Sequence, residues 1–104
     1  MPHIYHITNL QNWESSKDDE LYTTPSLNDE GLIHCCLDEQ VADILDRYYK
    51  DATDIVVLTI DTLKLRSQLV YEWSPSLEAT FPHIYGPINR DSVIGVKQIA
   101  AVRD

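Results

Sequence analysis

The run DIVVLTID, from Asp54 to Asp61, constrains the fold more than any other part of the chain. It is almost continuously apolar, rich in β-branched residues and bounded by an aspartate at each end. Such a run is typical of a strand buried on both faces, because a half-exposed strand alternates apolar and polar residues. We therefore predict that this segment is a central strand of a sheet.

The length and composition of the chain fit one hydrophobic core around that strand. The sequence has 104 residues, of which 43% are hydrophobic and only three are glycine. These values are typical of a folded globular protein and leave no room for a second independent core. We expect residues 1–104 to form a single domain.

Other strand signals are spread along the chain. Segments with β-branched and aromatic composition or strand-like spacing are 3–8, 31–36, 69–73 and 92–102. A further segment, Phe81 to Ile88, is aromatic and apolar but is interrupted by two prolines and a glycine. Because proline cannot donate to a sheet ladder, we expect an edge or irregular strand here, near a cleft.

Three segments carry helix signals. Thr8 to Gln11 has the form of a capping box and predicts a short helix over about 9–17. Thr24 and Pro25 are typical of a helix start, and Gly31 of its end. Apolar residues after Asp38 recur at helical spacing and predict the clearest helix. The predicted fold class is therefore α+β.

Net charge and hydropathy exclude several classes of partner. Seventeen acidic and eight basic residues give a net charge of −9, which disfavours nucleic acid and anionic membrane surfaces. The longest purely apolar run, Ile55 to Leu58, is too short to span a bilayer. With no secretory signal at the start, we expect a cytoplasmic protein, a monomer or a homodimer, whose partner is a small-molecule ligand.

Histidines in strand-like surroundings are the main functional signal. They are His6 in IYHIT, His34 in GLIHCC and His83 in FPHIY. Histidine donates, accepts or ligates near neutral pH, so convergence of the three would mark a polar cleft. The alternative is that each lies at the edge of the core and bonds only to backbone groups.

A metal site has little support in the sequence. It would use His6, His34, Cys36 and His83, because nitrogen and sulfur ligands suit zinc. No CxxC or HExxH spacing occurs, and the adjacent Cys35 and Cys36 read as reduced thiols. We expect no metal.

Three motifs in combination resemble a known family. IYHIT, EGLIHCC with a following helix that ends in RYY, and FPHIYGPI are similar to the family of domain of unknown function 952 (DUF952). Membership implies an ADP-ribosyltransferase-like fold, a split β-sheet with short helices, and no established activity. It also implies NAD as the candidate cofactor.

The implied fold suggests roles for individual residues. Tyr5 to Thr8 is similar to the aromatic-His-Gly-Thr motif that holds NAD, with Ile7 in place of glycine, so His6 would orient a ribose hydroxyl. Gly31 to Cys35 resembles the second motif of such transferases, a Gly-x-Tyr-Phe-Ala strand that leads to a helix, with Ile33 in place of the tyrosine. Tyr48 or Tyr49 would supply the second ring against nicotinamide.

The third motif of such transferases carries a glutamate. Phe81 to Tyr85 is the nearest match, with His83 in place of the acid and with Glu72 and Glu78 as candidate substitutes from neighbouring positions. RNA 2′-phosphotransferases share the fold without that glutamate but rely on arginines, of which this acidic chain has few. RNA is therefore disfavoured as a substrate.

The sequence thus predicts binding of a nucleotide-like or other small anionic ligand in a histidine-lined cleft, with or without ADP-ribosyl- or phosphotransferase chemistry. The candidate catalytic residues are His6, His34, His83 and Glu72. The candidate ligand-binding residues are Thr8, Tyr48, Tyr49 and Tyr85. The alternative is a non-catalytic binding or interaction module in which the histidines are structural.

Overall fold

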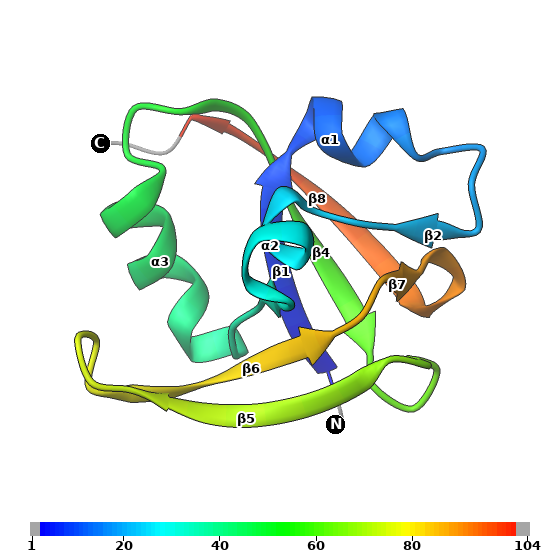
Figure 1. Cartoon of the computed structure of the whole chain (residues 1–104). Coiled ribbons are helices and arrows are strands. Elements are labelled where there is room, and N and C mark those ends of the chain that lie inside the picture. The colour runs from blue at the N-terminus through cyan, green and yellow to red at the C-terminus, as the bar shows by residue number, and fades with distance from the viewer. Residues whose placement is uncertain (1–2, 102–104) are drawn as a thin grey trace.

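The apolar run of the sequence forms strand β4 (Thr53–Asp61), the middle strand of an antiparallel sheet. The computed structural model describes residues 3–101. Strand β1 (His3–Asn9) pairs with one edge of β4 and β8 (Val93–Ala101) with the other (Figure 1). The predicted central position is confirmed. The prediction extended the last strand to Val102, which lies outside the described residues.

A second antiparallel sheet has the order β3-β6-β5, with β3 (Ile33–His34) and β5 (Gln68–Ser74) on either side of β6 (Ala79–Tyr85). The prediction of an edge or irregular strand around Pro82 is therefore wrong about the edge. Pro82 lies where β3 ends, and its carbonyl accepts a hydrogen bond from Cys35 N at 3.1 Å. Its missing N–H thus falls beyond the short ladder to β3, where a proline costs little.

The strand predicted over 31–36 forms only in part, because β3 has two residues. The chain then crosses to the first sheet, where Tyr5 and Cys36 form an isolated antiparallel bridge. Their backbone groups exchange hydrogen bonds of 2.8 and 2.7 Å. This bridge holds the end of the His34 segment against β1.

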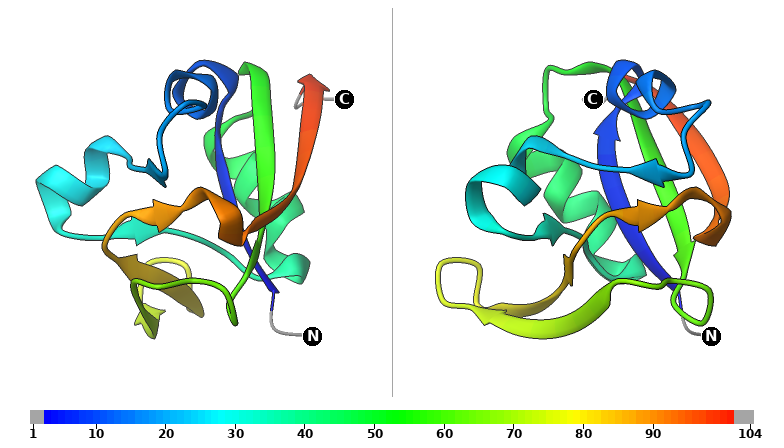
Figure 2. Two further views of the ribbon diagram at one scale, coloured as in Figure 1. Left: turned by 90° about the vertical axis from the view of Figure 1, so that its right-hand side faces the viewer. Right: turned by 45° about the vertical axis from the view of Figure 1, so that its right-hand side comes forward.

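A two-stranded sheet connects the remaining parts of the chain. It pairs β2 (Leu21–Tyr22) with β7 (Ile88–Asn89), and a 3-10 helix, η2 (Arg90–Ser92), leads from β7 into β8. Figure 2 shows this pair between the larger sheets.

Helix α1 (Leu10–Ser15) follows β1 directly, and the predicted cap at Thr8 is wrong. Asn9 is the N-cap, and its side chain accepts from Asn12 N at 2.7 Å. Thr8 is still paired with Val56 in the sheet, so its backbone is not free to begin the helix. Both residue types cap helices well, and the length of the strand decides between them.

The two other helix predictions agree with the structure. Helix α2 (Pro25–Glu30) begins after Thr24 and ends at Gly31, whose φ of +82° is left-handed. Helix α3 (Val41–Tyr48) is preceded by a 3-10 turn, η1 (Asp38–Gln40). No helix within residues 3–101 is long and apolar enough to cross a membrane.

Alternate residues of β4 point into two hydrophobic clusters. Val56, Leu58 and Ile60 belong to the first, together with side chains from β2, β3, β6 and β7. Ile55 and Val57 belong to the second, which α3 covers. Burial on both faces explains why the run is apolar without alternation.

Candidate functional site

A cleft of about 690 Å³ opens between β1, α2, β3, α3 and the tip of the β5–β6 hairpin. Its wall is mostly apolar and includes several aromatic rings, with small hydroxyl and amide side chains between them. None of the described residues that line it is Lys, Arg, Asp or Glu. The aromatic lining residues are Tyr5, Tyr48, Tyr49, Trp73 and Phe81.

His34 and His83 meet at one wall of this cleft. They are directly opposite each other in the register of β3 and β6. Their ring centroids are 5.2 Å apart and the planes are nearly perpendicular, at 85°. The antiparallel pairing therefore brings together two histidines that are 49 residues apart in the sequence.

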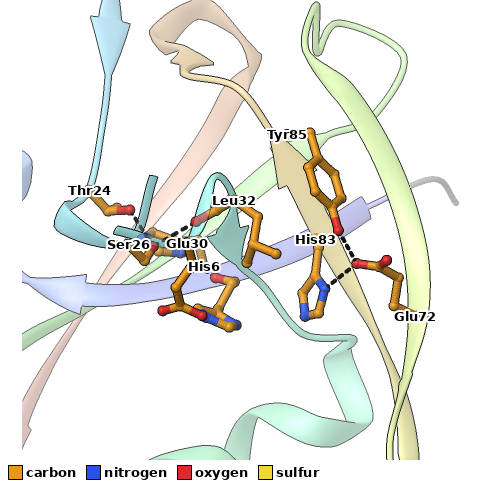
Figure 3. Close-up of polar contacts among 9 residues, drawn as sticks. His6, Thr24, Ser26, Glu30, Leu32, Glu72, His83 and Tyr85 are labelled. Carbon is orange, nitrogen blue, oxygen red and sulfur yellow. Dashed lines mark hydrogen bonds and ion pairs between the residues drawn. The ribbon is translucent and has the colours of Figure 1, made fainter. Parts of the chain in front are cut away.

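His83 is held by a carboxylate from the neighbouring strand. Its Nδ1 lies 2.6 Å from Glu72 Oε1, and the Tyr85 hydroxyl donates to the same oxygen at 2.5 Å (Figure 3). The hydrogen bonds from Tyr85 and His83 lower the pKa of the Glu72 carboxyl, so it stays ionised. The bond to Glu72 correspondingly raises the pKa of Tyr85.

His34 has a carboxylate partner of its own. Its Nε2 lies 3.1 Å from Glu30 Oε1, at the end of α2, and both side chains are more than half exposed. Further back in α2, Ser26 Oγ donates to the carbonyl of Leu32 at 2.8 Å and contacts Thr24 Oγ1 at 2.7 Å (Figure 3). These contacts fix the approach of the chain to β3.

His6 is buried beneath the cleft and has two partners within the protein. Its Nδ1 lies 2.7 Å from the carbonyl of His34, so this nitrogen carries the proton. Its Nε2 then accepts from the Tyr22 hydroxyl at 3.1 Å. Burial lowers the pKa of His6 to about 4, so the ring is neutral, and burial raises the pKa of Tyr22 to about 12.

The predicted ligand-binding residues are distributed unevenly. Thr8 lines the cleft but is itself buried, and Tyr49 lines it with its hydroxyl 3.4 Å from the carbonyl of Ile7. Tyr48 lies at the rim and is 62% exposed. Tyr85 does not line the cleft and instead contacts Glu72 beside it.

The two cysteines line the cleft as protonated thiols. Burial raises the pKa of Cys36 to about 12 and that of Cys35 well above its usual value. Thiols are poor nucleophiles and ligands until they ionise. In residues 3–101, no three His, Cys, Asp or Glu side chains are grouped so that they could hold a metal ion.

Sequence reasoning missed Glu30 and Trp73. Glu30 precedes His34 by four residues, a spacing that would have suggested a pair only if the helix end were known. Trp73 reaches the cleft because the β5–β6 hairpin folds its tip toward α3, which no local pattern indicates.

Fold and site together define a small α+β protein of mainly antiparallel strands, with an aromatic cleft on which two carboxylate-paired histidines meet. The chain belongs to the family described as Protein of unknown function (DUF952), which matches residues 7–96. None of the curated proteins matches it.

Solved structures of protein CC0527 from Caulobacter crescentus share the fold, among them a crystal structure and a solution NMR structure. The crystal structure has a TM-score of 0.82 at 24% identity and covers 92% of this chain and 84% of the other. The solution NMR structure has a TM-score of 0.81 at 24% identity and covers 96% and 86%. The α+β arrangement is therefore shared with a bacterial protein solved by two methods.

Proposed function

We propose that the cleft binds a small nucleotide-like ligand and that His34 and His83 act on it as hydrogen-bonding or acid–base groups. One observation carries this proposal: the two histidines, each paired with a carboxylate, meet on the wall of an aromatic cleft. A mostly apolar pocket with a few convergent polar groups is the usual form of a small-molecule site. Tyr48 and Trp73 offer the ring faces on which a base would stack.

The finer fold assignment, ADP-ribosyltransferase-like, belongs to this proposal. Two three-stranded antiparallel sheets joined by a short pair are compatible with a split β-sheet of that kind. It would make NAD, or a compound derived from it, the first ligand to test. In that case His6 is a supporting residue, since orienting a ribose hydroxyl would require it to give up its bond to Tyr22.

A second candidate is a non-catalytic binding or interaction module. The observation that favours it is His6, whose two ring nitrogens are both occupied by protein groups. Under this alternative, the carboxylate partners of His34 and His83 likewise serve stability alone. The two candidates differ in whether substitution of His34 or His83 changes the response to a ligand.

A thermal-shift screen tests the proposal. The compounds are NAD, ADP-ribose, nucleosides, nucleotides and divalent metal ions, each with wild type, His34→Ala and the control His3→Ala. A ligand at 100 times its Kd adds about 2.7 kcal/mol of stability, a clear rise in Tm. We expect a rise with at least one ribose compound that His3→Ala retains and His34→Ala loses. No rise with any of them would exclude the nucleotide-like ligand, and an equal rise in all three proteins would exclude a role for His34.

A further inference from the structure

We propose that His34 and His83 together accept hydrogen bonds from two neighbouring hydroxyl groups of the ligand, so that the cleft recognises a vicinal diol such as that of ribose. This inference rests on the proposed function and names the chemical group that the cleft selects. It is carried by the hydrogen bonds that the two histidines already make inside the protein.

The two carboxylates determine which ring nitrogen of each histidine carries a proton. An ionised carboxylate only accepts, so the nitrogen that faces it must donate. Glu72 Oε1 lies 2.6 Å from Nδ1 of His83, and Glu30 Oε1 lies 3.1 Å from Nε2 of His34. In the neutral rings, the lone pairs therefore lie on His83 Nε2 and His34 Nδ1.

Neither of these two lone pairs has a hydrogen-bond partner among residues 3–101. Among residues 3–101, each ring is hydrogen-bonded only to its carboxylate. The bond from His6 goes to the backbone carbonyl of His34 and not to its ring. Both side chains line the cleft, and His83 is only 17% exposed. For His83, a largely buried acceptor that lacks a partner favours a ligand that brings a donor.

The closeness of the two rings favours two adjacent donors on one ligand. The rings meet edge to face across paired strands, with centroids 5.2 Å apart. Vicinal hydroxyls on a sugar ring present two O–H donors within a few ångströms of each other. Because two carboxylates pair with the histidines and none of residues 3–101 that line the cleft is Lys or Arg, this part of the ligand should be uncharged.

The test variants change the carboxylate that determines which nitrogen of His83 carries the proton. Glu72→Ala removes the acceptor that keeps the proton on His83 Nδ1, whereas Glu72→Gln leaves an amide oxygen that replaces it. Glu78→Ala is the control, because Glu78 lies in the exposed turn of the same hairpin and has no hydrogen bond to a histidine.

The first measurement needs no ligand. ¹⁵N NMR of the imidazole nitrogens of the full chain reports which one is protonated. We expect Nδ1–H for His83 in wild type, Glu72→Gln and Glu78→Ala, and loss of that preference in Glu72→Ala. A dominant Nε2–H form of His83 in wild type would overturn the proposal.

The second measurement compares adenosine and NAD with their forms lacking the 2′- or the 3′-hydroxyl on a ribose. We expect removal of either hydroxyl to raise Kd by about three- to tenfold, the range for one hydrogen bond. His34→Ala and His83→Ala should each lose part of this discrimination. If the deoxy compounds bind as tightly as the parents, the diol inference fails while the proposed function stands. If neither parent binds, the proposed function fails and the inference falls with it.

Discussion

His6 donates its Nδ1 proton to the backbone carbonyl of His34 across a distance of 2.7 Å, although the two residues are 28 positions apart in the sequence. This bond joins the edge strand β1 to the short strand β3. The buried histidine therefore holds the backbone of the exposed one in place. A second bond runs from the Tyr22 hydroxyl to His6 Nε2, so both ring nitrogens of the buried histidine have a hydrogen-bond partner.

Replacement of His6 by alanine should destabilise the protein. His6 is 5% exposed, and its loss leaves the His34 carbonyl without its side-chain partner and removes one partner of the Tyr22 hydroxyl. Leaving a buried polar group unpaired costs about 1–3 kcal/mol. Urea unfolding of His6→Ala should show this loss, with His3→Ala within about 0.5 kcal/mol of wild type. A His6→Ala variant as stable as wild type would mean that these bonds contribute nothing net.

The free energy of unfolding should decrease as the pH is lowered, because burial disfavours protonation of His6. Its pKa is lowered from 6.5 to about 4 by burial, so between these values the unfolded chain takes up a proton that the folded protein does not. The contribution is complete above pH 6.5 and decreases as the pH falls towards 4, by about 3 kcal/mol in all.

Comparison of wild type with His6→Gln isolates this contribution from that of the carboxyl groups. The decrease in unfolding free energy from pH 7 to pH 4.5 should be smaller in His6→Gln than in wild type. His3→Gln should keep the wild-type dependence. An identical decrease in wild type and His6→Gln would contradict the low pKa of the buried ring.

Removal of the Glu72 carboxylate should lower the pKa of Tyr85. The hydrogen bond to Glu72 is the largest cause that raises it, because an ionised tyrosine cannot donate to a carboxylate. NMR titration of the Tyr85 ring carbon should therefore move to lower pH in Glu72→Ala and stay unchanged in Glu78→Ala. A shift in both variants would indicate a general effect of net charge instead.

Parts of the fold were predictable because the signal was local. The β4 run needs burial on both faces wherever it is placed, and Thr24, Pro25 and Gly31 carry the start and the end of α2 within a few residues. Each of these patterns depends on backbone conformation and solvent exposure, which are properties of a short segment.

The site was predictable only as a list of residue types. His34 and His83 meet because β3 and β6 pair in one register, and a shift by one residue would turn one ring to the opposite face. The contact between Glu72 and His83 depends in the same way on the register of β5 against β6. The central position of β6 was missed because β3, its second partner, has only two residues.

Trp73 should report on the cleft by fluorescence. The chain has two tryptophans, of which Trp13 is 7% exposed in the core and Trp73 is 63% exposed at the cleft. Acrylamide should therefore quench mainly Trp73, and Trp73→Phe should abolish most of the quenching.

A bound ligand that stacks on Trp73 should protect it from acrylamide. Saturating adenosine or NAD should reduce quenching in wild type and have no effect on the residual quenching in Trp73→Phe. Stacking of a base on an aromatic side chain contributes about 1–3 kcal/mol, so Trp73→Ala should raise Kd at least about fivefold. Because Trp73 is exposed, the same substitution should leave the free energy of unfolding within about 0.5 kcal/mol of wild type. Unchanged affinity in Trp73→Ala would place the base elsewhere in the cleft, for example against Tyr48.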